Sequence, residues 1–510
     1  MTLAPAARRR RLVAPDAPTY RWWLLAVTSL GALLASLTGG TLVIALPDIL
    51  RDLHTDLFAL LWIVVGYTLV STVLVLNAGK LADRWGRVRA FTGGVALFTL
   101  ASVWCAIAPD PTLLILGRVI QGVGGAFMLA TSSALVTDAF PRSELGKALG
   151  INAMVVGAGL ILGPILGGFL TTFGWRTVFW VNLPVGLAAI GLALLVLVEQ
   201  MPPQRKVSID WVGSALYLVA LLSLMTALAF GGVYGWDTWW IIGGVILFVV
   251  VMPILAWVEV RVSSPLFDLE LLRDRRFLMG NLTGLLNGVA RNGVLFLLVF
   301  YLQGVQGVDP VLAGVMLAPL ALGLLVLSPI SGMLADRHGP RGLATLGMVV
   351  TGIGLAGLMT IGTDTPYWQL ALWQLVIGAG SGLFQSPNTS AVMGVVPPQK
   401  RGVGAGIRGM LTSTGFVISI ALAIGLMTTA MDPDVMVSIF AGTQVGSQGI
   451  DLDPFIQALH IAFGAGVIAS FVGAAVSWGR GAEPGEPSRA PAMEVGAESV
   501  VEDVEAGAAI

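Results

Sequence analysis

The stretch "GKLADRWGRVR" runs from Gly79 to Arg89 and places one acid and four cations in eleven positions. On each side the chain is apolar for about twenty residues, which is the length of helix that crosses a bilayer. A similar stretch, "GMLADRHGPR", runs from Gly332 to Arg341. A charged turn between long apolar segments that occurs twice predicts two repeated helical hairpins.

The composition excludes a soluble globular protein. The chain has 510 residues, of which 56% are hydrophobic and 11% are charged, whereas soluble domains carry about 25% charged residues. Cys105 is the single cysteine and the three histidines are scattered, so the sequence predicts no disulfide, no metal site and no cofactor. We therefore expect an all-α integral membrane protein with many spans.

Hydropathy predicts fourteen transmembrane helices. Each range is apolar and close to the length that a bilayer requires. The ranges are 22–46, 57–78, 90–108, 112–135, 146–171, 177–198, 210–230, 238–258, 278–302, 311–334, 342–361, 367–393, 403–430 and 455–478. The abundant glycine, 65 residues, suits close packing between membrane helices.

The cations indicate the orientation of these spans. Alternate connections, counted from the N-terminus, hold 23 of the 28 lysines and arginines, whereas the other connections hold only Arg51 and Arg176. Positive residues gather on the cytoplasmic side, so both termini are expected to be cytoplasmic, in the plasma membrane of a bacterium. The first apolar segment has the basic flank of a signal peptide but is too long, and we expect it to be retained.

The repeat predicts how the spans are grouped. Asp83 and Asp336 lie 253 residues apart, which corresponds to about eight helices, so a six-helix repeat with two helices inserted at the centre fits the spacing. The predicted parts are a basic N-terminus (1–21), a six-helix bundle (22–200), two inserted helices (201–260), a second six-helix bundle (261–480) and an acidic disordered tail (481–510). The connection 431–454 is either a lid or a solvated connector.

Three motifs in chain order resemble those of the major facilitator superfamily, and the resemblance covers roughly residues 22–480. The first hairpin resembles the signature of its loop between helices two and three. "LGRVIQGVGGAF" (116–127) resembles its fourth-helix motif, with Arg118, Gln121 and Gly122 in place. "GLILGPILGGFL" (159–170) resembles its fifth-helix antiporter motif, with Gly159, Gly163, Pro164, Gly167 and Gly168. "YLQGVQGVDPVLAG" (301–314) and "FQSPNTSAVM" (384–393) resemble the second half of its fourteen-helix drug:proton antiporters.

The resemblance implies a secondary transporter that exports small hydrophobic or amphipathic compounds by proton antiport and alternating access. It implies partners limited to a small-molecule substrate, protons and the lipid bilayer, with no nucleic acid, no enzyme activity and a monomeric chain. It also implies that Arg118 takes part in proton coupling and that the two hairpins act as gates on the cytoplasmic rim. The gating residues would be Gly79, Asp83, Arg84, Gly86, Arg87, Asp336, Arg337, Gly339 and Arg341.

Polar residues inside the spans are candidates for substrate binding or coupling. Arg118 and Gln121 share a helix face, Asn287 and Arg291 lie four residues apart, and Arg408 lies inside span thirteen. A charged side chain at the centre of a membrane costs about 2.5–3.5 kcal/mol on insertion scales, so each must face protein or water. Each could instead brace neighbouring helices. Aromatic candidates for substrate contact are Trp62, Tyr67, Phe296, Tyr301 and Trp373.

The acids depart from the family pattern. The fourteen-helix antiporters commonly carry an acid in the first helix, where this sequence has Thr38, a further candidate for the substrate path or coupling. No span has an acid near its middle, and the acids nearest to the membrane, including Asp48, Asp138 and Asp210, lie near span ends. The embedded arginines favour an alternative: a specific exporter of an anionic or lipid-like metabolite, with different or no proton coupling. A membrane enzyme or sensor is disfavoured, because no embedded acid–base pair and no GxxxxGK[ST] loop occurs.

Overall fold

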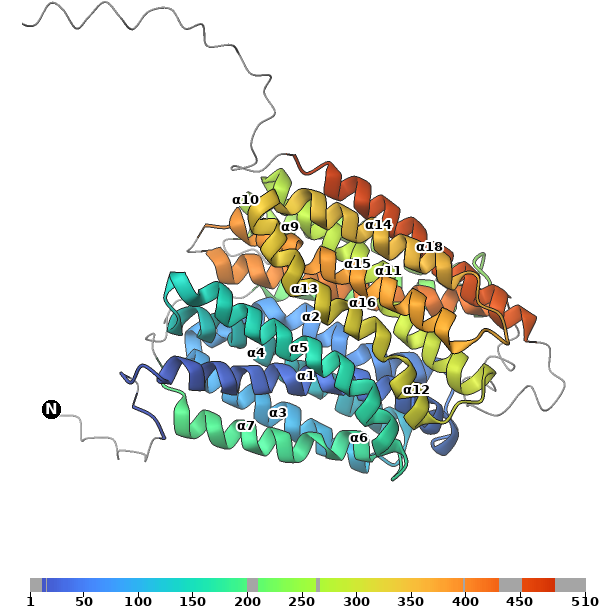
Figure 1. Cartoon of the computed structure of the whole chain (residues 1–510), viewed down its shortest axis with the longest axis horizontal. Helices are drawn as coiled ribbons and strands as arrows, with labels where there is room; N and C mark the ends of the chain where they lie inside the picture. The colour runs from blue at the N-terminus through green and yellow to red at the C-terminus, as the bar shows by residue number, and fades with distance from the viewer. Residues whose placement is uncertain are drawn as a thin grey trace, which may run out of the picture.

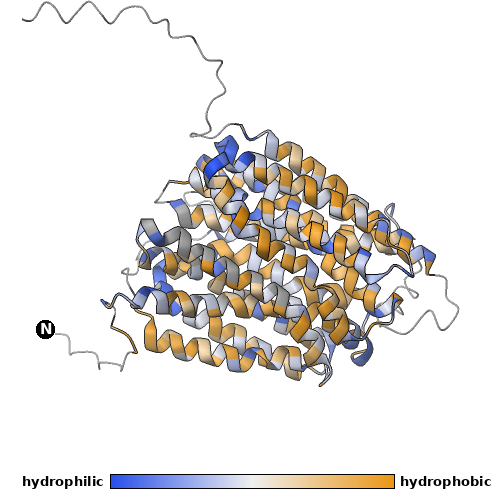
Figure 2. Ribbon diagram, viewed as in Figure 1, coloured by the Kyte–Doolittle hydropathy of each residue, from blue (hydrophilic) through white to orange (hydrophobic). Residues whose placement is uncertain are grey.

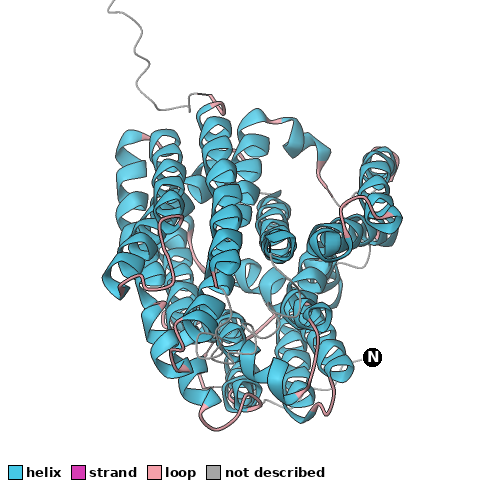
Figure 3. Ribbon diagram, turned by 90° about the vertical axis from the view of Figure 1, so that its right-hand side faces the viewer, coloured by secondary structure: helices cyan, strands magenta, loops and turns pink. Residues whose placement is uncertain are grey.

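The computed structural model describes residues 12–14, 16–199, 210–262, 267–397, 400–430 and 452–481. Within these ranges the regular structure is entirely helical (Figures 1 and 3). The helices are α1 (Tyr20–Asp52), α2 (Leu57–Trp85), α3 (Arg87–Ile107), α4 (Pro111–Ala139), α5 (Arg142–Thr171), α6 (Thr177–Trp180), α7 (Asn182–Val196), α8 (Trp211–Tyr234), α9 (Trp239–Glu259), α10 (Leu269–Arg273), α11 (Arg275–Phe300), the π-helix η1 (Tyr301–Val305), α12 (Pro310–Met316), α13 (Ala318–His338), α14 (Pro340–Leu358), α15 (Tyr367–Gly394), α16 (Arg401–Ala430) and α18 (Asp453–Trp478).

Each of the fourteen predicted ranges is occupied by a helix or by two consecutive helices. The sixth range divides into α6 and α7, and the tenth divides into α12 and α13. Twelve described helical segments are long and apolar enough to cross a membrane. Of the other two ranges, α5 contributes the shorter apolar segment Leu162–Thr171 among the residues whose side chains the structure describes, and α15 carries the polar run "QSPNTS" at 385–390. The all-helical membrane fold is confirmed, and the count of fourteen spans stays a prediction.

The helices pack into two groups (Figure 1). In the first group α1 packs against α4, α5 and α7, while α3 packs against α4 and α7 and α2 packs against α4. In the second group α15 packs against α13 and α14, while α18 packs against α11, α14 and α16. Apolar residues run along the helices of both groups and polar residues gather at the helix ends (Figure 2). We call the two groups the N-terminal and the C-terminal half.

Helices α8 and α9 lie outside both halves. α8 packs against α16 and α2, and α9 packs mainly against α8. The face of α9 that is turned away from α8 is apolar and exposed; it includes Trp239, Ile246, Val249 and Trp257. This is the face that a helix presents to lipid. The division into six, two and six helices and the acidic tail stay predictions, because most of 1–21, 201–209, 431–454 and 482–510 lies outside the described residues.

The two halves meet along two equivalent seams. One seam joins α2 to α16, and the other joins α5 to α12 and α13. The repeated hairpin motif makes α13 the counterpart of α2, so α16 takes the place of α5 in the second copy. Each half therefore uses the same pair of helices to contact the other, as an internal repeat requires.

The two ends of the helical bundle carry different features: the charged turns lie at one end, and the two halves touch closely at the other. We call the end with the turns at Gly86 and Gly339 the hairpin end, and the other the closed end. At the closed end the backbones of the two halves are in contact: a Cβ built on Gly168 of α5 would lie 2.3 Å from the Pro310 carbonyl oxygen of α12. A Cβ on Gly314 of α12 would lie 2.3 Å from the Pro164 carbonyl oxygen. Only glycine allows helices to approach this closely.

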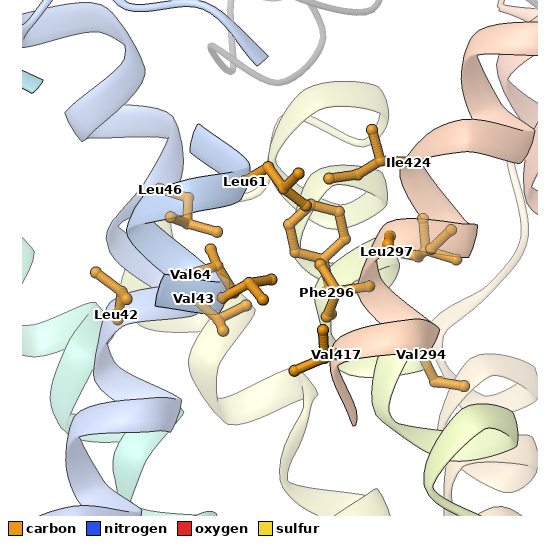
Figure 4. Packing of buried hydrophobic residues seen from close by; sticks show 14 of the residues in the cluster. Leu42, Val43, Leu46, Leu61, Val64, Val294, Phe296, Leu297, Val417 and Ile424 are labelled. Atoms are coloured by element: carbon orange, nitrogen blue, oxygen red, sulfur yellow. The ribbon is translucent and has the colours of Figure 1, made fainter. Parts of the chain in front are cut away.

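Apolar side chains complete this contact. Leu61 and Val64 of α2 lie beside Phe296 of α11, and Ile424 of α16 flanks the same ring (Figure 4). Phe296 is 1% exposed. The Gln303 amide of η1 donates a hydrogen bond of 3.2 Å to the Ile44 carbonyl of α1. If the hairpin end is cytoplasmic, as the cations predict, this arrangement is sealed on the outer side.

Candidate transport and gating sites

A buried polar network occupies the interior of the N-terminal half. Arg118 of α4 is 1% exposed, and its Nε donates a hydrogen bond of 2.9 Å to the Ile63 carbonyl of α2. Its Nη1 donates to Gln121 Oε1, and the Gln121 amide donates a bond of 2.7 Å to Ser102 Oγ of α3. The predicted face of Arg118 and Gln121 therefore joins three helices of one half.

Thr38 stands at the far end of the same network. Its hydroxyl donates a bond of 3.2 Å to Asn182 Oδ1 of α7, and Asn182 Nδ2 donates one of 3.3 Å to Ser102. Thr38, Asn182 and Ser102 are all buried. The position where the sequence resemblance leads one to expect an acid thus faces the inside of the N-terminal half. The sequence analysis missed Asn182 and Ser102, and their polarity inside apolar spans was the only available signal.

Tyr67 ties α2 to α4 beside this network. The guanidinium of Arg118 lies 4.8 Å from the centre of the Tyr67 ring, a favourable cation–π arrangement. A Cβ on Gly122 would lie 2.6 Å from the Tyr67 carbonyl oxygen, and one on Gly125 would lie 2.8 Å from the ring. The close helix approach expected at these glycines is present. Trp62 is partly buried and lies edge-on to Phe58, 6.2 Å between ring centres.

Arg291 and Arg408, the candidate cations of the C-terminal half, each make fewer described hydrogen bonds than Arg118. Arg291 Nη2 donates a bond of 3.2 Å to its neighbour Asn292, and Arg408 Nη1 donates one of 3.2 Å to Thr389 of α15. Both side chains are partly exposed, and the Nε of each is buried without a hydrogen-bond partner. The described ion pairs include no carboxylate on either arginine. These guanidinium groups are thus available to a bound anion or carbonyl.

The other candidates of this half lie apart from the two arginines. Asn287 is buried and its amide contacts Met348 Sδ of α14 at 3.4 Å. Tyr301 donates a bond of 2.7 Å to the Gly362 carbonyl. Trp373 packs onto Gly357 of α14. Among the predicted aromatic contacts, Phe296 is the one placed between the halves (Figure 4).

The glycines of the fifth-helix motif fit α5 against two different helices. A Cβ on Gly163 would lie 2.9 Å from Gly40 of α1, and one on Gly167 would lie 2.8 Å from Thr41. Gly159 faces Ser36 of α1. Gly168 instead faces α12 of the other half. The motif thus serves both the packing of one half and the seal between halves, with Pro164 contributing its carbonyl to that seal.

The first hairpin is an ion-paired turn inside the N-terminal half. Gly86 has φ of 102°, a conformation that favours glycine. Arg87 Nε donates a bond of 2.8 Å to Asp83, and its Nη1 donates one of 2.6 Å to Asp138 of α4. Glu199, which follows α7, accepts a bond of 2.6 Å from the Arg87 backbone N–H and caps α3. The sequence analysis did not identify Glu199.

The second hairpin differs from the first. Gly339 repeats the positive φ, at 79°, but Pro340 stands where the first copy has Arg87. Arg341 donates a bond of 2.9 Å to the Trp478 carbonyl and stacks on the Trp478 ring at 4.4 Å. Arg84 and Arg337 are exposed, and Gly79 lies near Ala130 of α4. The side chain of Asp336 lies outside the described residues. The gating role of both hairpins stays a prediction.

The ion pairs of Arg87 allow a first prediction. Arg87→Ala should lower the unfolding free energy by about 1–2 kcal/mol, since two charge-assisted bonds are lost at a partly exposed site. The measurement is thermal unfolding of the purified protein in detergent. Arg89→Ala is the matched control, because Arg89 lies in the same turn and is exposed. Equal melting temperatures for both variants would show that the ion pairs do not stabilise the hairpin.

Comparison with known proteins identifies the family to which this architecture belongs. A model of the Major Facilitator Superfamily matches residues 28–420 and, in a second match, 280–500. The chain is 32% identical to the riboflavin transporter RibZ of Clostridioides difficile over 402 residues, 79% of this chain and 87% of that protein. It is 32% identical to the tetracenomycin C resistance and export protein of Streptomyces glaucescens over 415 residues, 81% of this chain and 77% of that protein.

A solved structure shares the fold. It is a bacterial homolog to the human lysosomal transporter Spinster, in an inward-facing and occupied conformation. The TM-score is 0.65 with 15% sequence identity, and the match covers 91% of this chain and 97% of that chain. At this identity the likeness concerns the fold alone.

Proposed function

Because the chain belongs to the Major Facilitator Superfamily, a family of transporters, we propose that it exports small hydrophobic or amphipathic compounds by proton antiport. The two halves would rock against each other about the seams α2–α16 and α5–α12. We place it in a bacterial plasma membrane with both termini cytoplasmic, a placement that the cation distribution supports. The fourteen-helix drug:proton antiporters are the subfamily that its motifs resemble most.

The arginines of the C-terminal half carry the proposal about substrate charge. Arg291 and Arg408 are partly exposed, lie inside helices and have no carboxylate among their described partners. A guanidinium that no described carboxylate neutralises attracts anions and carbonyl oxygens and repels cations. We therefore propose substrates that are uncharged or anionic and carry carbonyl groups. Riboflavin, named for one relative, has this chemistry.

Everted vesicles from cells that produce the protein test this function. An inside-acid pH gradient is imposed, and its collapse is followed after adding riboflavin, tetracenomycin C or the cation ethidium. We expect an uncharged compound to collapse the gradient and ethidium to leave it intact. Collapse by ethidium alone would contradict the proposed substrate charge, and uptake of labelled riboflavin without collapse would contradict proton coupling.

Arg291→Gln should raise the concentration of the uncharged compound needed for half-maximal collapse by about 10- to 150-fold, because one charge-assisted hydrogen bond contributes about 1.5–3 kcal/mol. The same vesicle assay measures it. Arg261→Gln is the matched control, since Arg261 is exposed and stacks on Trp257 of α9, 3.8 Å from the ring centre. An unchanged concentration in Arg291→Gln would remove Arg291 from the substrate site.

A second candidate is a specific exporter of an anionic or lipid-like metabolite without proton coupling. The observation that favours it is the placement of the acids: in the described helices every Asp and Glu lies within five residues of a helix end. Uptake without gradient collapse in the vesicle assay would select this candidate.

A further inference from the structure

A groove runs between α1 and α5 at the hairpin end of the N-terminal half, where the two helices lie side by side (Figure 1). Its volume is about 360 Å³. The lining is mostly apolar and includes Trp22, Leu25, Ala26 and Leu30 of α1 with Ile151 and Val155 of α5. Toward the closed end, Gly159 and Gly163 bring α5 into close contact with α1, so the groove ends there.

The groove opens on the side of α5 that is turned away from the C-terminal half. Gly168 marks the side of α5 that touches that half. With about 3.6 residues per turn, Val155 lies roughly 140° and Ile151 roughly 100° around the helix from Gly168. On α1, Trp23 and Ala26 are exposed, and no described residue of the C-terminal half lines the groove. The groove therefore faces the surrounding bilayer.

The internal repeat indicates that this seam lacks a cover. In the C-terminal half α16 is the counterpart of α5, and the helix that follows it, α18, packs against it. In the N-terminal half the helix that follows α5 is α7, which packs against α1 and α3, and no described residue of α7 lines the groove. An apolar hollow that faces a bilayer favours a hydrocarbon chain as its occupant.

Arg21 stands at the hairpin end of the groove. Its Nη2 pairs with Glu144 of α5 at 3.1 Å, so this ion pair joins the two helices that form the groove. Its guanidinium lies 6.0 Å from the centre of the Trp22 ring and 5.9 Å from that of Phe140. The Arg21 Nε is buried without a hydrogen-bond partner among the described groups. Because the side chain is 30% exposed, a second anionic group can reach it.

The sequence before α1 also favours an anionic partner. Four consecutive arginines, Arg8–Arg11, precede the helix. Leu12, the next residue, donates a backbone hydrogen bond of 3.2 Å to the Leu195 carbonyl near the end of α7. Basic clusters beside a transmembrane helix attract anionic lipids. Trp22 and Trp23 are side chains of the kind that lies at the level of the lipid head groups.

Ser29 gives the wall of the groove a polar atom. The residue is 5% exposed, and its hydroxyl has no hydrogen-bond partner among the described groups. The neighbouring Thr28 hydroxyl, in contrast, donates a bond of 3.0 Å to the Leu24 carbonyl. A buried hydroxyl without a partner is unfavourable, and an occupant with an acceptor oxygen would satisfy it. The ester carbonyls of a phospholipid are acceptors of this kind.

We propose that this groove binds one anionic phospholipid, with an acyl chain between α1 and α5 and its phosphate on Arg21. The apolar lining matches the chain, and the exposed guanidinium matches the charge of the phosphate. The lipid covers the part of the seam that α7 leaves open, and it packs against α5, the helix that seals the halves at the closed end. The proposal depends neither on the compound that is exported nor on proton coupling.

Fluorescence quenching in nanodiscs tests the site. In a Cys105→Ala background, Trp23→Cys carries a bimane label beside the groove, and lipids with a nitroxide on the acyl chain quench it. We expect phosphatidylglycerol to reach half-maximal quenching at a mole fraction about 5- to 10-fold lower than phosphatidylcholine, the range between an exposed ion pair and a charge-assisted hydrogen bond. Ile246→Cys on the exposed face of α9 is the matched control and should show equal values. Equal values at Trp23→Cys would overturn the proposal, because they indicate bulk bilayer lipid only.

Arg21→Gln tests the contact with the phosphate. The two lipids should then quench the label at Trp23→Cys with the same half-maximal mole fraction. Arg89→Gln should keep the preference for phosphatidylglycerol, because Arg89 is an exposed arginine at the same end of the N-terminal half. A preference that survives in Arg21→Gln would overturn the assignment of the phosphate to Arg21.

Ala26→Phe tests the chain site by filling the groove while Arg21 stays in place. Ala26 is exposed, so the variant should fold, and a melting temperature equal to that of the parent protein checks this. We expect the preference for phosphatidylglycerol to be lost. Val249→Phe on the exposed face of α9 is the matched control and should keep it. A preference that survives in Ala26→Phe would show that the head group binds without the groove, and would overturn the chain site.

Discussion

Gly168→Val should break the contact between the halves at the closed end. The added Cβ would lie 2.3 Å from the Pro310 carbonyl oxygen and 2.8 Å from the Val311 Cα, both backbone atoms that cannot rotate away. Overpacking of this kind costs about 1–3 kcal/mol. Since the cost applies only to the closed arrangement, the ratio of closed to open molecules should fall by about 5- to 150-fold. Transport should fall with it, because alternating access requires both arrangements.

Cysteine labelling measures this change. Cys105 is the single cysteine, so a Cys105→Ala background allows Leu61→Cys to report on the closed end through a membrane-impermeant maleimide. Leu61 is fully buried in the closed arrangement, and its labelling should rise strongly in Gly168→Val. The matched control is Gly39→Val in α1, where a Cβ meets no atom within 4 Å. Equal labelling in the two variants would refute a sealing role for Gly168.

Arg118→Met should destabilise the N-terminal half by about 2–4 kcal/mol and abolish transport. The substitution removes the donors to the Ile63 carbonyl and to Gln121, and the buried Gln121 oxygen that is left without its described donor costs about 1–3 kcal/mol. The cation–π contact with Tyr67 is lost as well. Thermal unfolding in detergent and transport in vesicles measure the two effects.

A double variant distinguishes a structural role of Arg118 from a direct role in proton coupling. Replacing both partners of a buried hydrogen bond by apolar groups can be nearly neutral, so Arg118→Met with Gln121→Leu should recover much of the stability. Because the described contacts of Arg118 all lie within one half, we expect part of the transport to return with it. Recovery of stability without transport would instead assign Arg118 a direct part in proton coupling, as the family resemblance implies.

The fold could be predicted well because hydropathy and charge are read directly along the chain. Apolar length and the alternation of cations require no knowledge of contacts, and every predicted range became helical. The breaks at Val181 and Leu317 were missed, although Pro184 and Pro319 follow them and proline removes a hydrogen bond of the preceding helical turn. The repeat also suggested two equivalent hairpins, but Pro340 replaces Arg87 in the second copy and removes its ion pairs.

The candidate site was predicted less completely, because it depends on which face each residue presents. The pairing of Arg118 with Gln121 followed from helical spacing alone. Thr38 was expected near the substrate path, yet it faces Asn182 from a helix 144 residues away in sequence. Asp210 was noted as an acid near a span end, whereas Glu259 fell just beyond a predicted span. Both carboxylates lie beside Gly213 because α8 packs against α9, which no local pattern encodes.

The seal at the closed end is made of peptide carbonyls, glycine and apolar side chains. None of the described contacts of this seal, the Gln303 amide included, uses a titrating side chain, so we expect its strength to change little with ionic strength or pH. If the proposed proton coupling holds, we expect the gradient to act on the two halves through the charged hairpin end rather than through this seal. The contact between the halves at the closed end would then be insensitive to solution conditions, whereas the hairpin end would respond to them.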